Sequence, residues 1–410
     1  YYTDGYLYLN LMGEKMKKVA IFSNNLQLGG VQKSLINLLN AISGKYEIHL
    51  YLLDKDNELL PFVPKNVIVE EIGYPLRLMG ISHNTAKEES FFRGLQSFIL
   101  RGVTRICGKK FVVPYIVNST KCINEEFDVA ISYVHDGGDK SFYGGCNEFV
   151  FKKVKARRKF SFMHGDFLKC GSNTAYNVQI LSGFDKVICV SRYCAESMKI
   201  AVPSIKEKIT YVPNFINYDE IVRLANDAPQ KYDPTNINLV TIARLSKEKG
   251  LIRVLPALRR LIDGGKKIKW YIIGDGAYKD AVRNEIDKEK LTEDVVLVGK
   301  QTNPYKYMLN ADLFVLPSYE EAEGMVIKEA LGLGVPVLAT DTGATRDILS
   351  EEYGFICNNN DEDLTKILVE VIGEKDLIEA KKANLRCYKP NNIESMMRIQ
   401  ALIEGMDETN

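Results

Sequence analysis

The amino-acid sequence predicts an α/β protein made of two doubly wound, Rossmann-like parallel-sheet domains that face each other across a cleft. Short continuous apolar runs alternate with segments of helical apolar spacing, which is typical of parallel sheets covered by helices. The chain has 410 residues, more than one typical domain needs. A stretch rich in Pro, Asn and Asp follows residue 225 and indicates a linker between the two series of runs.

The second half of the chain shows this alternation most clearly. Apolar residues at helical spacing follow the run INLVTIA and predict a helix over residues 250–264. Short apolar runs separate the helical segments, as expected for strands that are buried on both faces. The strands expected here are residues 237–243, 269–274, 294–299, 312–318 and 336–340.

The first half repeats the scheme less regularly. Its strand candidates are the runs VAIFS, EIHLYLL, VIVEEI, FDVAISY, KFSFMH, KVICVS and ITYV. From these patterns we expect an N-terminal extension over residues 1–17 and a first Rossmann-like domain over 18–220. A second domain is expected over 221–388, followed by a C-terminal helix over 389–410 that packs back on the first domain.

Composition excludes several classes of protein. With 54 basic and 53 acidic residues, the net charge of +1 argues against a general nucleic-acid binder. The eight cysteines form no CxxC pair, so we expect neither a zinc ribbon nor a disulfide scaffold, and a reducing cytoplasm is the simplest setting. No run of 18 apolar residues occurs, and the N-terminal segment lacks the pattern of a signal peptide.

Two loops of the second half carry residues suited to a diphosphate. Arg244 and Lys249 follow the first strand and precede a helix, where two cations and the helix dipole favour an anion. The alternative is a solvated basic turn. Gly274 and Gly276, in the GDG after the next strand, let the backbone approach a ligand closely, although a GxG alone is a weak signal. The carboxyl ends of parallel strands share one sheet edge, so these loops are expected to meet there.

Residues 317–336, PSYEEAEGMVIKEALGLGVP, place four glutamates at the start of an apolar helix. Acidic residues in a first helical turn complement the helix dipole, so Glu320, Glu321 and Glu323 have an ordinary interpretation as solvated charges. Glu329 lies further along, among apolar neighbours. A function in ligand binding is therefore the competing interpretation for this stretch.

Taken in order, these motifs resemble those of the GT-B-fold glycosyltransferases of family 4, the group 1 type found in bacterial polysaccharide assembly. The family's GRLxxxKG appears as ARLSKEKG, its GDG as GDG, and its PSxxEGFGxxxxEAxxxGxPV as PSYEEAEGMVIKEALGLGVPV. The two motif glutamates fall on Glu321 and Glu329. The sequence departs from the pattern at Ala322 and Glu323, where the family has Gly and Phe, which leaves the choice of donor sugar open.

The resemblance implies a site for a nucleotide-sugar donor in the second domain and an acceptor in the first. Arg244 and Lys249 would bind the donor diphosphate and stabilise the leaving nucleotide. Glu321 would accept hydrogen bonds from the sugar hydroxyls and Glu329 from those of the ribose. Backbone N–H groups would also face the donor. The residues that would supply them, or allow close backbone approach, are Gly274, Gly276, Gly324, Met325 and Val326.

In the first half the resemblance covers fewer residues. Gly29 and Gly30 match the family's glycine loop near the donor phosphate or acceptor, and His164 matches its histidine on the donor sugar. Asn214 matches the asparagine of a PNG turn and is expected to bind the donor, while Ser191 is expected to be a residue of the cleft or hinge. A lone histidine at a strand end is otherwise commonly structural.

No metal or other cofactor is expected. The residues Asp-Lys-Asp at 54–56 are similar to a divalent-cation motif of another glycosyltransferase fold. We interpret them as a polar turn, because the cationic pair Arg244 and Lys249 makes a metal unnecessary. The resemblance also implies a front-face mechanism, in which the donor phosphate takes the acceptor proton and catalysis rests on electrostatics and positioning.

Residues 91–110 are predicted to form a basic amphipathic helix, which indicates binding to an anionic membrane surface. Its basic residues are Arg93, Arg101, Arg105, Lys109 and Lys110, and KKVKARRK at 152–159 adds further positive charge. The alternative is a helix docked on the core of the first domain. We expect a peripheral enzyme on the cytoplasmic side of the membrane.

The sequence therefore predicts a retaining glycosyltransferase. It would move a hexose-type sugar, most simply from a UDP-linked donor, to a lipid-linked or glycan acceptor in surface polysaccharide or capsule synthesis. Two alternatives remain open at this point: a nucleotide-sugar epimerase on the same fold, and a non-catalytic, membrane-associated sugar-nucleotide-binding protein.

Overall fold

The computed structural model describes residues 16–54 and 57–406. The expected extension at 1–17 and the turn at 54–56 therefore lie largely outside the described residues. The chain divides into two compact units. Unit 1 runs to Phe215 and resumes at Ile393, and unit 2 is Ile216–Asn392. We expected the boundaries at 220/221 and 388/389. Because the first boundary lies at 215/216 instead, α9, which begins at Tyr218, belongs wholly to unit 2.

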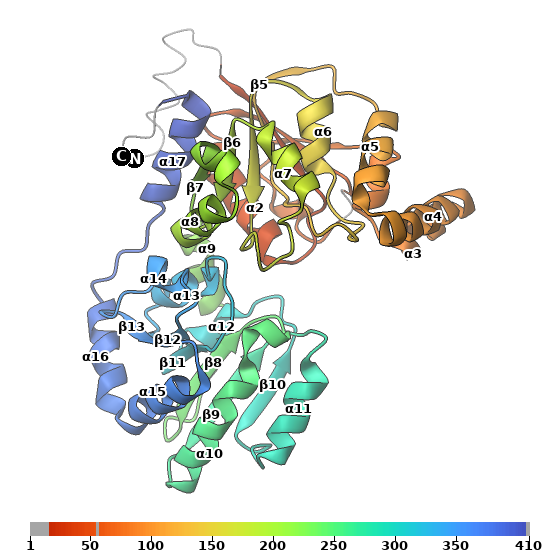
Figure 1. The fold of residues 1–410 in the computed structure, drawn as a ribbon. Helices are drawn as coiled ribbons and strands as arrows, with labels where there is room; N and C mark the ends of the chain where they lie inside the picture. Colours follow the sequence, from red (N-terminus) through yellow and green to blue (C-terminus); the bar gives the residue numbers. More distant parts are fainter. Residues whose placement is uncertain (1–15, 55–56, 407–410) are drawn as a thin grey trace. The chain divides into compact units, whose positions relative to one another are not determined.

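Unit 1 contains a seven-stranded sheet in the order β3-β2-β1-β4-β5-β6-β7 (Figure 1). Every neighbouring pair is parallel. The strands are β1 (Lys18–Ser23), β2 (Glu47–Leu52), β3 (Ile68–Glu71), β4 (Glu126–Ser132), β5 (Lys155–Met163), β6 (Lys186–Cys189) and β7 (Ile209–Tyr211). The order reverses direction beside β1, which is the switch point of a doubly wound sheet.

The helices of unit 1 bury apolar residues on both faces of this sheet. They are α2 (Gly30–Ile42), α3 (His83–Glu89), α4 (Phe91–Cys107), α5 (Lys109–Ser119), α6 (Cys146–Lys153), α7 (Ala175–Ser182), α8 (Arg192–Ala201) and α17 (Ile393–Glu404). Three 3-10 turns are η1 (Leu60–Phe62), η2 (Leu76–Met79) and η3 (Pro203–Lys208). The final helix, α17, packs on this unit through Ile399, Leu402 and Ile403.

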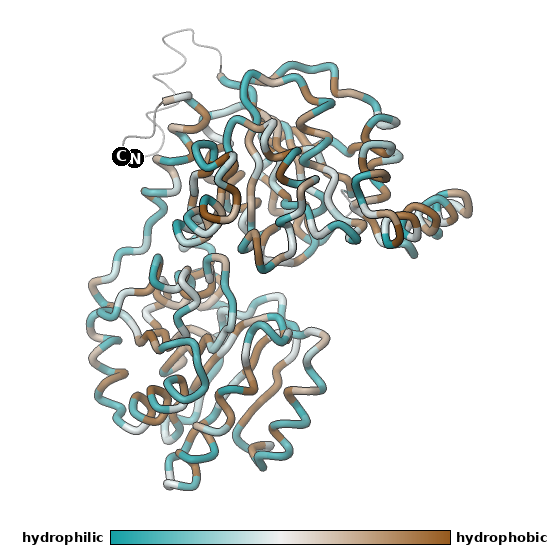
Figure 2. The backbone as a smooth tube through the Cα atoms, in the orientation of Figure 1, coloured by the Kyte–Doolittle hydropathy of each residue, from teal (hydrophilic) through white to brown (hydrophobic). Residues whose placement is uncertain are grey.

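Unit 2 contains a six-stranded parallel sheet in the order β10-β9-β8-β11-β12-β13. The strands are β8 (Ile237–Ile242), β9 (Ile268–Ile273), β10 (Val295–Gly299), β11 (Leu313–Leu316), β12 (Val337–Thr340) and β13 (Gly354–Cys357). Counted along this unit, the order is the 3-2-1-4-5-6 of a Rossmann fold. Figure 2 shows the largely apolar strands expected for a sheet covered on both faces.

The helices of unit 2 are α9 (Tyr218–Asn226), α10 (Leu255–Asp263), α11 (Lys279–Lys288), α12 (Tyr305–Met308), α13 (Met325–Gly332), α14 (Thr345–Ile348), α15 (Asp361–Gly373) and α16 (Lys375–Leu385). Two 3-10 turns, η4 (Lys247–Lys249) and η5 (Leu251–Val254), precede α10. The helix predicted over residues 250–264 thus begins as a 3-10 turn. The left-handed conformation of Gly250 separates η4 from η5, and Pro256 lies in the first turn of α10, where it needs no hydrogen-bond partner.

The two parallel-sheet units confirm the predicted fold class. One local prediction is wrong, because the basic segment at 91–110 is not one helix. The helix α4 ends at Cys107, and Gly108 has a φ of +84°, a left-handed value that L side chains rarely adopt. Lys109 and Lys110 therefore belong to α5. Among the described residues, no helix has both the length and the apolar content to cross a bilayer.

Candidate functional site

The residues of the second half that were predicted to bind the donor diphosphate and sugar lie at the carboxyl ends of the strands around the switch point of unit 2. Strand β8 pairs with β9 on one side and β11 on the other. The loop after β8 carries the basic residues, the loop after β9 carries GDG, and the loop after β11 carries the glutamates. Ligands of doubly wound sheets bind at this position. The sequence motifs are therefore brought to one edge of one sheet.

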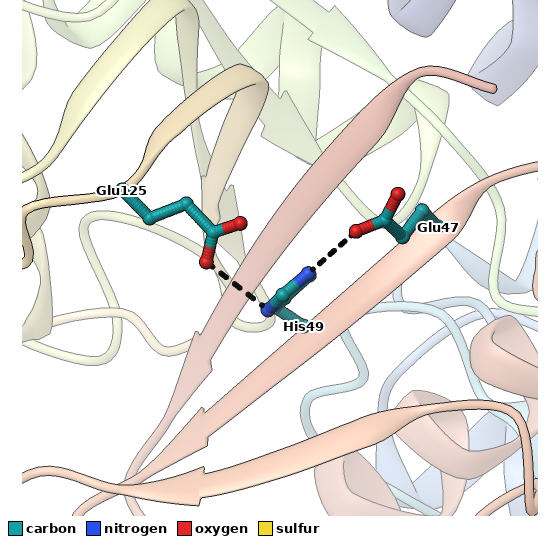
Figure 3. Close-up of side chains that lie close together, drawn as sticks. All are labelled: Glu47, His49 and Glu125. Atoms are coloured by element: carbon teal, nitrogen blue, oxygen red, sulfur yellow. Dashed lines mark hydrogen bonds and ion pairs between the residues drawn. The ribbon is translucent and has the colours of Figure 1, made fainter. Parts of the chain in front are cut away.

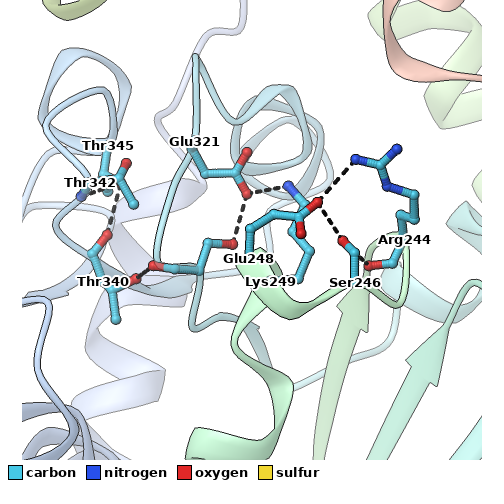
Figure 4. A network of polar contacts seen from close by, with 9 residues as sticks. Arg244, Ser246, Glu248, Lys249, Glu321, Thr340, Thr342 and Thr345 are labelled. Carbon is cyan, nitrogen blue, oxygen red and sulfur yellow. Dashed lines mark hydrogen bonds and ion pairs between the residues drawn. The ribbon is translucent and has the colours of Figure 1, made fainter. Parts of the chain in front are cut away.

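An ion pair joins two of these loops. The Nζ atom of Lys249 donates to Oε1 of Glu321 at 2.6 Å, and the hydroxyl of Ser318 donates to the same oxygen at 2.8 Å (Figure 4). The side chains of Lys249 and Glu321 are 20% and 10% exposed, so solvent screens this pair only in part. The hydroxyl of Thr340, on β12, donates to the carbonyl of Ser318 and supports the same loop.

Arg244 lies at the solvent side of this network. Its Nη2 atom donates to Oε1 of Glu248 at 3.0 Å, and the Ser246 hydroxyl donates to that oxygen at 2.6 Å. Although partial burial alone would raise the pKa of Glu248, the hydrogen bonds from Ser246 and the backbone, with Arg244, lower it below its usual value. The Arg244 side chain is 72% exposed. Its guanidinium is thus accessible to an incoming anion.

Glu248 was not identified from the sequence as a residue of this site. The only signal was its position between two lysines in RLSKEKG. Its carboxylate orients Arg244, and its backbone carbonyl accepts from the N–H of Tyr319 at 2.8 Å. Glu248 therefore links the basic loop to the glutamate loop.

Three glycines allow the loops to pack against one another. A Cβ atom on Gly274 would lie 1.9 Å from the carbonyl oxygen of Ala243, and one on Gly276 would lie 2.2 Å from that of Leu245. A Cβ on Gly250 would lie 2.2 Å from the carbonyl oxygen of Pro317. We expected Gly274 and Gly276 to admit a ligand. In the structure these positions must be glycine for another reason, because a side chain there would collide with the backbone of the neighbouring loop.

A second residue missed in the sequence is Arg253, in η5. Only 3% of its side chain is exposed. Its Nη1 atom donates to the Pro317 carbonyl at 3.0 Å and to Oδ1 of Asn359 at 2.8 Å, while Nε donates to Asp361 at 2.6 Å. The guanidinium also lies over the ring of Tyr319, 4.2 Å from its centroid. Arg253 thus holds the glutamate loop in place through its contacts with Pro317 and Tyr319.

The helix α13 begins directly after this loop. Gly324 precedes it with a φ of +85° and, having no side chain, cannot cap the helix. The first N–H groups of the helix, including those of Met325 and Val326, therefore donate no hydrogen bond to a side chain at the cap position. Glu323 is 3% exposed and forms an ion pair with Lys328. The interpretation of Glu323 as a solvated charge is therefore wrong, because the side chain is buried, whereas Glu320 is exposed as expected.

Glu329, on α13, is buried with 7% exposure. The hydroxyl of Tyr305, on α12, donates to its Oε1 atom at 2.9 Å. A buried carboxylate held in this way is pre-positioned to accept further hydrogen bonds. Tyr305 is a supporting residue that the motif did not include.

In unit 1, the predicted residues lie at the carboxyl ends of β1 and β5. Gly29 precedes α2 in an extended conformation, and a Cβ on Gly30 would meet no atom within 4 Å. His164 follows β5 directly, and its Nε2 atom lies 2.9 Å from the carbonyl oxygen of Tyr133. Desolvation by the surrounding protein, with a smaller contribution from His135, lowers the pKa of His164 to about 3. Its imidazole is therefore neutral at physiological pH.

Two other residues of unit 1 have structural partners. Asn214 is 8% exposed, and its Oδ1 atom accepts from the hydroxyl of Ser34 on α2. Ser191 caps α8, because its side chain accepts from the N–H of Cys194 at 3.2 Å. These contacts position the chain at the ends of β6 and β7.

The basic residues predicted to face a membrane divide into two groups. Lys109 is 1% exposed and donates to the Gly137 carbonyl at 2.6 Å, and Arg101 donates to the Ile81 carbonyl at 2.8 Å. The prediction of a surface role is wrong for Lys109, because its ammonium group is buried, and the Arg101 guanidinium is directed to the protein. Arg105 and Lys110 are exposed. Arg93 lies over the ring of Tyr74.

Most of the large apolar residues of α4 face solvent, whereas Leu100 is buried. In Figure 1 this helix lies with α3 at the edge of unit 1. Its exposed apolar side chains and their exposed fractions are Phe91 (73%), Phe92 (78%), Leu95 (46%), Phe98 (68%), Ile99 (51%), Val103 (38%) and Ile106 (83%). We call this set the α4 apolar surface. The alternative of a helix whose apolar side docks on the core does not hold for these residues.

Comparisons with known proteins agree with this fold. The model of the family described as glycosyl transferases group 1 matches residues 223–386. Over 387 residues, 90% of both chains, the sequence is 30% identical to a Campylobacter jejuni enzyme, N-acetylgalactosamine-N,N'-diacetylbacillosaminyl-diphospho-undecaprenol 4-alpha-N-acetylgalactosaminyltransferase. It is 28% identical over 203 residues to the capsular polysaccharide biosynthesis glycosyltransferase CapM of Staphylococcus aureus, covering 48% of this chain and 53% of CapM.

Against the first curated relatives that it matches, the chain spans 35% to 53% of the relative's own length. A crystal structure of Anabaena HepE in complex with UDP and glucose superposes with a TM-score of 0.67 at 16% identity, over 95% of this chain and 100% of that one. At that identity the likeness concerns the fold. The long match to the Campylobacter jejuni enzyme, the family match and the GT-B architecture agree: the chain belongs to the group 1 glycosyl transferases.

Proposed function

We propose that this protein is a retaining glycosyltransferase that moves a hexose-type sugar from a UDP-linked donor to a lipid-linked or glycan acceptor in bacterial surface polysaccharide synthesis. The observation that carries the proposal is the network at the switch point of unit 2, where Lys249 contacts Glu321 and Arg244 remains accessible. The names of the relatives, which include an undecaprenol-linked acceptor and a capsular polysaccharide, support the acceptor class. The UDP bound to HepE supports the donor class.

The basic residues would stabilise the charge that develops on the leaving group. In the transfer, the bond between the anomeric carbon and the donor phosphate oxygen breaks, and a bond to the acceptor oxygen forms on the same face. The acceptor proton passes to the departing phosphate. Arg244 would donate two parallel hydrogen bonds to this phosphate, and Lys249 would place a single positive charge beside it. Cations that are already in position stabilise the negative charge that develops on a leaving group.

The acidic residues would bind hydroxyl groups of the donor. Glu321 accepts from Lys249 and Ser318 through Oε1 alone. We therefore assign its Oε2 atom to the sugar hydroxyls. Glu329, held by Tyr305, would accept from the ribose, and the N–H groups of Met325 and Val326 would face the phosphate or sugar.

No metal is needed for this reaction. Arg244 and Lys249 supply two positive charges where a divalent cation would otherwise neutralise the diphosphate. In unit 1 the neutral imidazole of His164 is available as a hydrogen-bonding partner for substrate hydroxyls, and the open space at Gly30 leaves room for a substrate beside the start of α2.

The α4 apolar surface would bind the protein to a membrane that carries its acceptor. Amphipathic helices insert apolar side chains between lipids while neighbouring cations contact anionic head groups. Arg105 and Lys110 are exposed for this role. Lys109 has no part in it, because its side chain is buried.

Product analysis tests this function against the epimerase alternative. The full-length protein is incubated with UDP-sugars, with and without membrane extracts or undecaprenyl-linked acceptors, and the products are identified by mass spectrometry and proton NMR. The proposal predicts that sugar consumption requires an acceptor and yields an α-linkage from an α-linked donor. Free sugar or an epimerised nucleotide-sugar formed without acceptor, or a β-linkage, would contradict it.

A further inference from the structure

A polar cluster lies near the amino ends of the strands in unit 1, at the opposite sheet edge from His164. It consists of Lys18 on β1, Glu47 and His49 on β2, Glu70 on β3, and Glu125 just before β4. Figure 3 shows the ring of His49 between the carboxylates of Glu47 and Glu125. None of these residues belongs to the proposed transfer site. We call the set the His49 cluster.

The two ring nitrogens of His49 have different surroundings. Nε2 lies 3.1 Å from Oε1 of Glu47, within hydrogen-bonding distance, so the Nε2–H tautomer donates to that carboxylate. The ring is buried, with 5% exposure, and its Nδ1 atom has no hydrogen-bond partner. The Nδ1 lone pair of that tautomer instead faces Oε2 of Glu125 at 3.5 Å and Oε1 of Glu70 at 3.6 Å. A lone pair directed at two anionic oxygens is unfavourable, so this space calls for a positive charge, either a proton on Nδ1 or a bound cation.

These separations match the edge of a metal coordination shell. Zinc lies about 2.0–2.2 Å from nitrogen and carboxylate ligands, so two ligands at a tetrahedral angle are about 3.4 Å apart. The distances from Nδ1 to Glu125 and Glu70 are close to this value. Glu47 on the far nitrogen also has a counterpart in known sites, where a carboxylate accepts from the other N–H of a metal-bound histidine and fixes its tautomer.

The charge of the cluster also favours a cation. Lys18 lies 2.5 Å from Oε1 of Glu125 and 3.2 Å from Oε1 of Glu47, and it is the one ammonium group in a set with three carboxylates, those of Glu47, Glu70 and Glu125. With a neutral His49 ring, these groups carry a net charge of −2. Lys18 contacts the Oε1 atom of Glu125 and leaves Oε2 to face His49. A metal at Nδ1 therefore does not require Lys18 to move.

We propose that Nδ1 of His49, Oε2 of Glu125 and Oε1 of Glu70 bind a divalent cation of the zinc class, with water completing the shell. One imidazole and two carboxylates suit Zn²⁺ and its neighbours better than Ca²⁺ or Mg²⁺, which prefer oxygen ligands alone. The cation would join β2 to β3 and to the start of β4. Its role is to stabilise unit 1, and the transfer reaction proceeds without it.

Cobalt binding tests the proposal with a signal that does not depend on activity. The full chain, without an affinity tag, is treated with EDTA, dialysed and titrated with Co²⁺, which absorbs in the visible when tetrahedral, and then with Zn²⁺. We expect about one Co²⁺ per chain, displaced by Zn²⁺, with affinity reduced at least tenfold in His49→Gln and in Glu70→Gln. His83→Gln is the matched control, because its Nδ1 is also buried and without a partner, and it should bind like the wild type.

The Glu70→Gln variant is expected to fold normally, because the Glu70 side chain is 48% exposed, so a loss of metal affinity in this variant cannot be ascribed to misfolding. Circular dichroism establishes that each variant is folded. Absence of the cobalt absorption would overturn the proposal and leave a protonated His49 ring as the occupant of this space. Equal affinity in wild type and both variants, or an intense thiolate-to-cobalt band that places the metal on cysteine, would overturn it as well.

Discussion

Lys249 and Glu321 meet at 2.6 Å between Nζ and Oε1, although 72 residues separate them in the chain. The contact joins the loop after β8 to the loop after β11, so the proposed diphosphate ligand and the proposed sugar ligand are held in one network. A bound donor would add its phosphate oxygens to the ammonium group, which has three donors. The pair thus pre-positions both side chains before the substrate arrives.

Substitution of either basic residue is expected to slow transfer. Arg244→Ala and Lys249→Ala should each lower kcat by about 10² to 10³, by analogy with the loss of one oxyanion donor. Because Arg244 is exposed, its substitution should leave the melting temperature nearly unchanged. Arg223→Ala is the control, since Arg223 is similarly exposed and bound to a neighbouring glutamate outside the site. Less than about threefold loss in both site variants would refute the assignment.

Arg253 is expected to act by positioning the glutamate loop. Replacing it with Met removes three hydrogen bonds from a buried guanidinium, which should cost about 3 kcal/mol of unfolding free energy. The loop of Pro317 and Tyr319 would lose its support, so KM for the donor should rise more than kcat falls. Arg253→Lys should restore part of both. Exposed Arg260, in α10, serves as the control. An unchanged KM in a destabilised Arg253→Met would show a role in stability alone.

The folding stability of the protein should depend on His164 at acid pH. Since its folded pKa is about 3, well below the ordinary 6.5, the unfolded chain binds a proton between these values that the folded chain does not. The free energy of unfolding therefore reaches its full value, as far as His164 is concerned, above pH 6.5, and it decreases as the pH falls below that value. The loss is up to about 2 kcal/mol at pH 5. Denaturant unfolding of wild type and His164→Asn from pH 5 to 7.5 measures it, and a pH-independent difference would be inconsistent with a neutral, desolvated ring.

The α4 apolar surface should determine membrane binding. The variant Phe92→Ser/Phe98→Ser removes two exposed aromatic side chains, each worth about 1.5–3 kcal/mol if fully inserted. Cosedimentation with phosphatidylglycerol vesicles should therefore weaken at least tenfold. Phe62→Ser is the control, because Phe62 is 56% exposed on another element of unit 1. Equal vesicle binding by the double variant and wild type would exclude this surface as the contact.

Much of the fold was predictable because it depends on local patterns. Parallel strands buried on both faces appear in the sequence as short apolar runs, and β8, β10, β11 and β12 fall within the runs identified, while β9 begins one residue before its run. The site loops were predictable for the same reason, since each directly follows such a strand. The Rossmann order then brings them together without further information.

The partners of individual side chains were not predictable in this way. Lys109 looked like a surface charge, but the fold places the Gly137 carbonyl against its ammonium group, 28 residues away. Glu323 is buried and paired with Lys328, although its position in a first helical turn suggested a solvated charge. Arg253 gave no signal, because its contacts lie at 317, 359 and 361. Helical spacing indicates which face is buried, whereas these contacts depend on tertiary packing.

The most direct test of the central claim is donor binding to wild type and Arg244→Ala, measured by thermal shift with UDP, GDP, ADP and their sugar conjugates, with and without EDTA. Ligand at 100 times its dissociation constant stabilises the folded state by about 2.7 kcal/mol. We expect UDP and a UDP-sugar to raise the melting temperature of the wild type, to do so equally with EDTA, and to lose most of this effect in Arg244→Ala. No shift with any nucleotide, equal shifts in wild type and variant, or a shift that requires added Mn²⁺ or Mg²⁺, would contradict the account.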